Sequence, residues 1–129
     1  MKTLCPLLCL LLTVASAQLP GGWVDADPYS KVIQDIAWKS VEVVNERHQN
    51  ENFYLVPMEV REAKYQIVAG VRYKLTVAYG YSDCSKQNMR PVDVGKANCP
   101  PGNCLTRVTH KILAWLKPWQ NFTQITVLE

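Results

Sequence analysis

Hydrophobic positions in the 129-residue chain recur first with a helical period and later with a strand period. A helix start is indicated at Asp27 and Pro28, because aspartate can cap free amide groups and proline fits the first helical turn. Apolar or small side chains then recur every three or four residues, which predicts an amphipathic helix ending near Arg47. This face consists of Ile33, Ile36, Ala37, Ser40, Val43 and Val44.

The period changes to two from about Phe53, which indicates antiparallel strands with one buried face. The clearest strand covers 71–81, where Val, Tyr and Leu alternate with polar or small residues. In the preceding segment the phase slips by one residue near Arg61-Glu62, which predicts a β-bulge. Between these two strand patterns lie Val68, Ala69 and Gly70. Glycine tolerates a positive φ, so a tight hairpin is expected there.

The C-terminal half predicts a long loop followed by two more strands. Residues 82–103 contain prolines, glycines and asparagines with little periodicity, as is typical of a loop. Strand patterns then cover 105–117 and 122–128, and Pro118 lies in the turn between them, where its missing N–H is tolerated. One helix followed by about four antiparallel strands predicts an α+β fold in a single domain.

The first 17 residues have the pattern of a secretory signal peptide. Lys2 supplies a positive start, residues 4–14 are apolar, and Ala15-Ser16-Ala17 resembles a cleavage site. The mature protein is then expected to be secreted and to consist of residues 18–129. No later stretch is long and apolar enough to suggest a membrane span, so no membrane partner is expected.

Charge and cysteine content exclude several classes of function. The net charge is only +3 and the basic residues are scattered, which argues against a nucleic-acid partner. After removal of the signal peptide three cysteines remain, Cys84, Cys99 and Cys104, so one disulfide can form and one thiol is left over. A structural zinc site needs four Cys or His ligands, and neither histidine is close to a cysteine in the sequence. We therefore expect no metal.

No arrangement of catalytic residues is evident either. A Cys104 nucleophile would need a nearby base, and six residues along one strand would place His110 about 20 Å away. The sequence also lacks a Gly-rich phosphate loop, a Gly-x-Ser-x-Gly elbow and a His-Glu-x-x-His motif. An enzyme is not expected.

Three segments are better explained by binding to a partner. Val68 and Ala69 lie in a predicted turn, where polar residues are more usual, and Trp119 lies in the second turn. In an antiparallel meander these two turns lie at the same end of the sheet, and exposed apolar groups gathered at one edge mark a partner site. The N-terminal segment Leu19-Pro20-Gly21-Gly22 offers an apolar arm on a flexible hinge.

These features resemble the secreted, single-domain (type 2) cystatins, which inhibit papain-like cysteine peptidases. Residues 66–70 match the family's Gln-x-Val-x-Gly hairpin, Pro118-Trp119 matches its second hairpin, and Gly21 matches its N-terminal glycine. The resemblance covers nearly all of the mature chain. It implies a cystatin-like fold, in which one long N-terminal α-helix packs on a four- to five-stranded antiparallel sheet, with no cofactor and no enzymatic activity.

The resemblance also implies a mechanism, in which the arm and both hairpins form a wedge that enters the cleft of a cathepsin-type peptidase. Leu19 and Pro20 would occupy non-primed subsites, Val68 and Ala69 would cover the catalytic centre, and Trp119 would pack on the primed side. Inhibition would be tight-binding, reversible and competitive. The predicted peptidase-binding residues are Leu19, Pro20, Gly21, Gly22, Gln66, Ile67, Val68, Ala69, Gly70, Pro118 and Trp119.

The cysteine pattern departs from that of the family, which usually has two disulfides. Cys84 and Cys99 match the first pair. His110 stands about where the upstream cysteine of the second pair would be, and the sequence ends at Glu129 without the downstream one. Cys104 matches neither pair, so a Cys84–Cys104 bridge is the alternative pairing.

Other features suggest further sites. Asn50-Glu51 lies in the loop through which some family members bind legumain-type peptidases, although the surrounding motif does not match. Asn121-Phe122-Thr123 is a glycosylation sequon, and a glycan there could obstruct the second hairpin. We expect a monomer, and strand exchange through the Val68 hairpin could give a domain-swapped dimer.

Two alternative functions follow from the same residues. One is a secreted cystatin-fold binding protein that does not inhibit peptidases, against which the intact wedge residues argue. The other is a small secreted hydrolase, against which the missing nucleophile–base pair argues.

Overall fold

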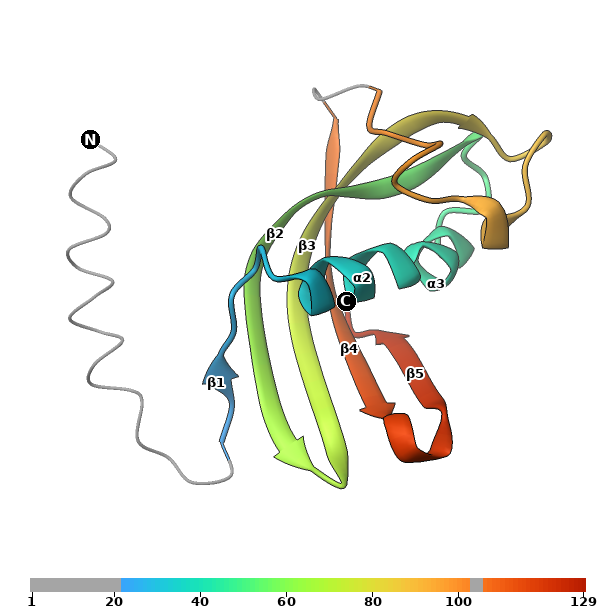
Figure 1. Cartoon of the computed structure of the whole chain (residues 1–129). Helices are drawn as coiled ribbons and strands as arrows, with labels where there is room; N and C mark the ends of the chain where they lie inside the picture. Colours follow the sequence, from blue (N-terminus) through green and yellow to red (C-terminus); the bar gives the residue numbers. More distant parts are fainter. Residues whose placement is uncertain (1–21, 103–105) are drawn as a thin grey trace, which may run out of the picture.

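The computed structural model describes residues 22–102 and 106–129, in which a curved five-stranded antiparallel sheet wraps around two short helices (Figure 1). The strands follow one another in the order β1-β2-β3-β4-β5. The bounds are β1 (Val24–Asp25), α2 (Lys31–Lys39), α3 (Val41–Glu46), β2 (Phe53–Val68), β3 (Gly70–Ser85), η1 (Pro91–Asp93), β4 (Arg107–Lys117), η2 (Pro118–Gln120) and β5 (Phe122–Val127). This arrangement confirms the α+β prediction. The predicted signal peptide, residues 1–17, lies outside the described residues.

The helical region begins later than predicted and is divided in two. The backbone N–H of Tyr29 donates a hydrogen bond to Asp27 Oδ1 at 2.9 Å. Residues 27–30 therefore form a turn, and α2 starts only at Lys31. Ser40 separates α2 from α3. Its hydroxyl contacts the Ala37 carbonyl and the Tyr79 hydroxyl, each at 2.6 Å. Helical backbone hydrogen bonds continue through this point, from the Ser40 N–H to the Ile36 carbonyl at 3.0 Å and from the Val44 N–H to the Ser40 carbonyl at 2.9 Å. The two helices therefore form together the long N-terminal helical segment that the sequence predicts.

The core lies between these helices and one face of the sheet. The helical face predicted from the sequence contributes Ile33, Ile36, Ala37 and Val44 to it. Each large aliphatic side chain buried in this way contributes about 1.5–3 kcal/mol. Tyr79 on β3 is fully buried, and this burial raises the pKa of its phenol well above the usual value. The sheet contributes Leu55, Val60, Ala63, Leu75, Val77, Tyr79, Ile112, Ala114 and Val127.

Irregularities in β2 keep its apolar residues on the core face. The predicted bulge is confirmed by a register shift between Val60 and Glu62, and two further shifts occur between Phe53 and Leu55 and between Pro57 and Glu59. Leu55, Val60 and Ala63 all belong to the core although their spacings, five and three, are odd. An odd spacing would place side chains on opposite faces of a regular strand. The register shifts turn these side chains back to the core face, and the sequence pattern had indicated only the shift between Val60 and Glu62.

Strand β1 was not predicted, because two residues are too few for a periodic signal. Val24 lies opposite Tyr65 and Asp25 opposite Lys64 on the edge of β2. The Lys64 Nζ lies 3.0 Å from Asp25 Oδ1, and this hydrogen bond raises the pKa of Lys64. The Ala26 N–H also donates to the Ala63 carbonyl at 2.9 Å. These contacts fix the direction in which residues 24–26 run along the edge of the sheet.

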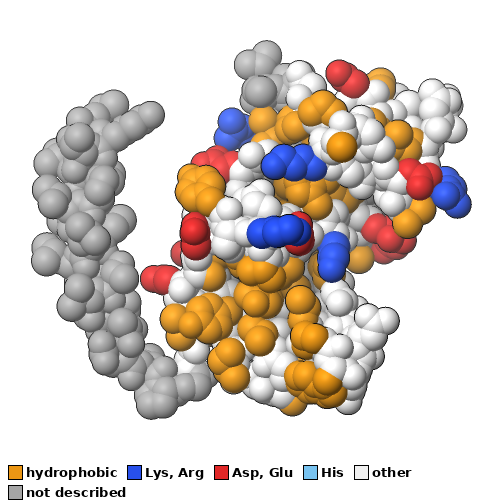
Figure 2. Space-filling model, in the orientation of Figure 1, with side chains coloured by type: hydrophobic (Ala, Val, Ile, Leu, Met, Phe, Trp, Pro, Cys, Tyr) orange, Lys and Arg blue, Asp and Glu red, His pale blue; other side chains and the backbone are white. Residues whose placement is uncertain are grey.

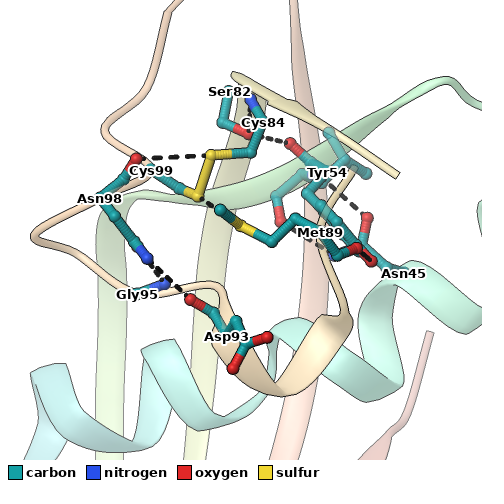
Figure 3. The surroundings of a disulfide bond; sticks show 10 residues. Asn45, Tyr54, Ser82, Cys84, Met89, Asp93, Gly95, Asn98 and Cys99 are labelled. Atoms are coloured by element: carbon teal, nitrogen blue, oxygen red, sulfur yellow. Dashed lines mark hydrogen bonds between the residues drawn. A yellow bond between two sulfur atoms is a disulfide. The ribbon is translucent and has the colours of Figure 1, made fainter. Parts of the chain in front are cut away.

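The long loop after β3 folds back over one end of the sheet and is tied down by a disulfide (Figure 3). Cys84 and Cys99 are bonded with a Cα–Cα distance of 5.8 Å, and Cys99 is fully buried. The Tyr54 hydroxyl donates to the Met89 carbonyl at 2.7 Å, and the Asn98 amide donates to the Asp93 carbonyl at 2.8 Å. This pairing leaves Cys104 outside the bridge, and Cys104 itself lies outside the described residues.

Two histidines join the helical end of the fold to the sheet. Nε2 of His48 lies 2.9 Å from Nε2 of His110, and Nδ1 of His110 lies 2.8 Å from the Glu129 main-chain oxygen. The two Nε2 atoms can share only one proton in this contact. Burial, followed by the neighbouring His110, lowers the pKa of His48 from its ordinary value of 6.5.

Acidification should therefore weaken the fold through His48. Because its pKa is lower in the folded state, the unfolded chain binds more protons once the pH falls through 6.5. The contribution of His48 to the free energy of unfolding is therefore at its full value above pH 6.5 and declines as the pH falls below it. We expect the urea midpoint to decrease between pH 7.5 and 5.5, and to decrease less in His48→Gln. Equal decreases in both proteins would contradict this assignment.

No helix among the described residues is long and apolar enough to cross a bilayer.

Candidate functional site

The first predicted binding segment forms the tip of the β2–β3 hairpin. Ala69 alone separates the two strands, and Gly70 has a φ of 90°, which supports the sequence-based choice of a positive-φ turn residue. Ile67 is 67% exposed and Val68 is 38% exposed, although both continue a strand whose other apolar residues are largely buried. The tip therefore presents apolar side chains to solvent on a short, sharply bent segment.

The second segment forms the β4–β5 connection. Pro118 starts the 3-10 turn η2, and Asn121 closes it in the left-handed conformation with a φ of 50°. This turn presents Trp119 with 64% of its surface exposed. Asn121 is exposed as well, so its side chain is accessible, and its glycosylation stays a prediction.

Both hairpin tips lie at the same end of the sheet, at the bottom of Figure 1. Hydrophobic side chains dominate this end on the face shown in Figure 2, and the charged side chains on that face lie farther up. Exposed apolar groups of this kind are expected where a partner binds. The structure thus brings together the two tips that the sequence had suggested would project together.

The described residues before β1, Gly22 and Trp23, lead towards the same end. Because β1 is antiparallel to β2 with Val24 opposite Tyr65, the chain before Val24 runs towards the β2–β3 tip. Gly22 is the only predicted arm residue that the structure describes, and it lies two residues before this pairing. The other predicted arm residues, Leu19, Pro20 and Gly21, lie outside the described residues.

Trp115, which the sequence analysis did not select, connects the two hairpins. Its indole Nε1–H donates to the Ala69 carbonyl at 2.8 Å, so a β4 side chain holds the first tip. Its ring packs edge-to-face on Phe122 of β5, with centroids 5.7 Å apart. No sequence signal could have revealed this hydrogen bond, because it joins residues 46 positions apart.

The backbones of the two hairpins also approach closely at Gly70. A Cβ atom placed on Gly70 would lie 2.3 Å from the Leu116 carbonyl oxygen. Such a distance is far below van der Waals contact, so only glycine fits. The hydrogen bond from Trp115 and this close approach make the two tips one connected surface.

The described residues contain no group of three His, Cys, Asp or Glu side chains that could hold a metal ion. The His48–His110 pair joins the segment after α3 to β4, and its partners are structural. What the tips can do chemically is bury apolar area against a partner and exchange backbone hydrogen bonds.

Comparison with known proteins identifies the family. Residues 21–128 match the family described as the cystatin domain. Onchocystatin of Onchocerca volvulus is 34% identical over 110 residues, which cover 85% of this chain and 66% of that protein. Cystatin cpi-1 of Caenorhabditis elegans is 36% identical over 110 residues, which cover 84% of this chain and 77% of that protein.

A solved structure agrees with this result. The salivary cystatin of the soft tick Ornithodoros moubata superposes with a TM-score of 0.69 at 27% identity, covering 86% of this chain and 95% of that one. The family match spans most of the chain and includes both hairpin tips. The chain therefore belongs to the cystatin family, whose members are inhibitors of cysteine peptidases and not enzymes.

Proposed function

We propose that the protein is a secreted type 2 cystatin that inhibits papain-like, cathepsin-type cysteine peptidases reversibly, competitively and tightly. The observation that carries this proposal is the position of both hairpin tips at one end of the sheet, with Ile67, Val68 and Trp119 exposed. Residues 22–23, which precede β1, lead towards the same end. Secretion rests on the signal-peptide pattern of residues 1–17 and is consistent with the Cys84–Cys99 disulfide.

The wedge, formed by residues 19–22, 66–70 and 118–119, enters the peptidase cleft in this mechanism. Leu19 and Pro20 occupy the non-primed subsites, with Gly21 and Gly22 allowing the backbone to lie close to the enzyme. Val68 and Ala69 cover the catalytic centre, and Trp119 packs on the primed side. The β2–β3 tip lies across the active-site cysteine without placing a peptide bond in attack geometry, so no covalent step occurs and the inhibitor dissociates intact.

Rigidity of the wedge favours high affinity. The Ala69 carbonyl is already engaged by Trp115, and η2 holds Trp119 between proline and a left-handed asparagine. A preorganised surface loses less conformational entropy on binding than a flexible one. Gln66 is also held in place, since it accepts a hydrogen bond from Arg72 Nη1 at 3.3 Å.

The direct test is a titration of active papain with the protein comprising residues 18–129, followed with a fluorogenic peptide. We expect stoichiometric inhibition that is reversed on dilution and relieved by excess substrate. Absence of inhibition by a folded monomer would refute the proposal and favour a cystatin-fold protein with another partner. Size-exclusion chromatography of the same sample separates the monomer from a domain-swapped dimer, whose straightened first tip would not inhibit.

Trp119→Ala should weaken papain inhibition about tenfold, because an exposed tryptophan on a rigid turn has the character of a binding hot spot. The measurement is the inhibition constant. Trp38→Ala removes the same side chain from α2, which lies away from the tips, and serves as the control. Equal inhibition constants for the wild-type and Trp119→Ala proteins would show that Trp119 does not contribute to the interface with papain.

A further inference from the structure

Three basic side chains lie beside the wedge on the sheet face that does not carry the core. Arg72 lies opposite Trp115 and Lys74 opposite Leu113 in the β3–β4 register, and Lys117 ends β4 opposite Phe122. These positions alternate with core residues such as Leu75 and Ala114, so they project from the other face. We call Arg72, Lys74 and Lys117 the cationic flank.

The cationic flank is stabilised by aromatic rings and not by carboxylates. Lys74 Nζ lies 4.5 Å and Arg72 Cζ 5.5 Å from the Trp23 ring centroid. Lys117 Nζ lies 4.1 Å from the ring centroid of Trp115. Rings at these distances attract and orient a cation without neutralising its charge. The three charges are therefore held in place and stay available to an anionic partner.

Cations elsewhere in the described part of the chain differ, since many of them are paired with acids. Among the described residues, no carboxylate oxygen lies within 4.0 Å of any cationic-flank nitrogen. Ion pairs are formed instead by Lys31, Arg61, Lys64, Arg90, Arg107 and Lys111. Seven described cations form no ion pair, and three of them, those of the cationic flank, lie together beside the hairpin tips. The other four are Lys39, Arg47, Lys86 and Lys96.

A surface hollow links the cationic flank to the wedge. It has a volume of about 330 Å³, and its lining includes Val68 of the first tip together with Arg72. Leu113 and Trp115 contribute apolar surface, and Gln124 and Thr126 contribute polar groups. An anionic side chain that enters the hollow meets the Arg72 guanidinium while its methylene groups contact Leu113 and Trp115.

We propose that the cationic flank is a second contact surface for the peptidase, which binds an acidic loop on the rim of the active-site cleft. This proposal rests on the proposed inhibitory function, because the tips bring the cationic flank against the rim. It implies that the preferred targets are papain-like peptidases with an acidic rim. Charges at the edge of an interface act mainly on the association rate, so the selectivity should appear in the association rate constant.

A protein rim fits this surface better than a long polyanion. The cationic flank has three cations, and Lys64, which lies opposite Lys74, is already paired with Asp25. Polyanions such as nucleic acids or sulfated polysaccharides are bound by denser basic stripes that contact many phosphate or sulfate groups. The hollow also adjoins Val68, so its occupant has to lie next to whatever the wedge binds.

The test compares two variants with the same loss of charge. Lys74→Gln/Lys117→Gln neutralises two charges of the cationic flank and leaves the aromatic rings in place. Lys39→Gln/Lys96→Gln neutralises one charge at the end of α2 and one in the loop at the far end of the sheet. Association and dissociation rate constants are measured for the protein comprising residues 18–129 with two papain-like peptidases, one with an acidic rim and one with a basic rim, at several salt concentrations.

We expect the Lys74→Gln/Lys117→Gln variant to associate about tenfold more slowly with the acidic-rim enzyme at low salt. The difference should disappear near ~0.5 M salt, where charges are screened within a few ångströms. Association with the basic-rim enzyme should be unchanged or faster, and the control variant should behave as the wild type does.

Three results would overturn the proposal. Equal slowing by both variants would show a general effect of net charge, and no slowing by either would show that the cationic flank does not contact the enzyme. Binding of a heparin fragment that is lost in Lys74→Gln/Lys117→Gln, with unchanged association with both enzymes, would assign the surface to a sulfated polysaccharide. Failure of the wild type to inhibit either peptidase is a separate outcome, and it would refute the proposed function itself.

Discussion

Gly70→Ala should weaken inhibition of papain by about a hundredfold and lower the free energy of unfolding by about 2–4 kcal/mol. Two effects combine at this residue. Its φ of 90° is unfavourable for any residue with a side chain, and a Cβ atom would lie 2.3 Å from the Leu116 carbonyl oxygen. The β2–β3 tip therefore has to move away from β4. That movement would also break the hydrogen bond from Trp115 to the Ala69 carbonyl, which positions the β2–β3 tip of the wedge.

Gly95→Ala is the matched control for this experiment. A Cβ atom on Gly95 would meet only the Asn98 side-chain oxygen, at an ordinary contact distance of 3.6 Å. The substitution adds the same methyl group in the long loop at the far end of the sheet, and it should leave the inhibition constant unchanged. Inhibition constants and urea unfolding curves are measured for all three proteins. If Gly70→Ala inhibits as well as Gly95→Ala does, the closed geometry of the first tip is not required.

Removal of the disulfide should lower stability without removing inhibition. The bridge joins Cys84 to Cys99, 15 residues apart in sequence. Opening a loop of this length costs about 3 kcal/mol on the chain-entropy account. Because the bridge ties the long loop to the sheet end opposite the tips, the wedge should keep its geometry (Figures 1 and 3). We therefore expect Cys84→Ser/Cys99→Ser to unfold at a lower urea concentration and still to titrate papain with the same stoichiometry below its unfolding range.

Both cysteines have to be replaced together, since a single replacement would leave a thiol that could pair with Cys104. Cys104→Ser is the control and should change neither stability nor inhibition. Loss of stability in Cys104→Ser equal to that in the double variant would show that Cys104 takes part in the native pairing. Loss of inhibition in a folded double variant would show that the long loop supports the wedge.

Much of the fold could be predicted from the sequence, because it depends on local periodicity. The helical face with Ile33 and Ile36, the alternation through Leu75 and Val77, and the turn at Gly70 all correspond to what the structure contains. The helix starts later than predicted, and the one-residue irregularity at Ser40, whose hydroxyl contacts the Tyr79 hydroxyl, was not predicted. Residues 39 positions apart in sequence make this contact, and no local pattern encodes it.

The candidate site also has features that the sequence predicts and features that depend on the tertiary structure. The sequence alone determined the residues of the two hairpin tips and their apolar character, because turn chemistry and a short motif are local properties of Gln66–Gly70 and Pro118–Trp119. It also determined the β period and the order of the strands, from which the two tips are expected at one end of the sheet.

Only the tertiary structure decided how the tips are held and what lies beside them. The bond from Trp115 to Ala69, the approach of Gly70 to Leu116, and the pairing of β1 with β2 join segments that are distant in sequence. The cationic flank likewise depends on tertiary structure, because the folded sheet brings Arg72 and Lys74 of β3 next to Trp23, which precedes β1. The physical reason is that hydrogen bonds, close packing and cation–aromatic contacts act over a few ångströms, and the folded sheet, not the order of residues, determines which groups come that close.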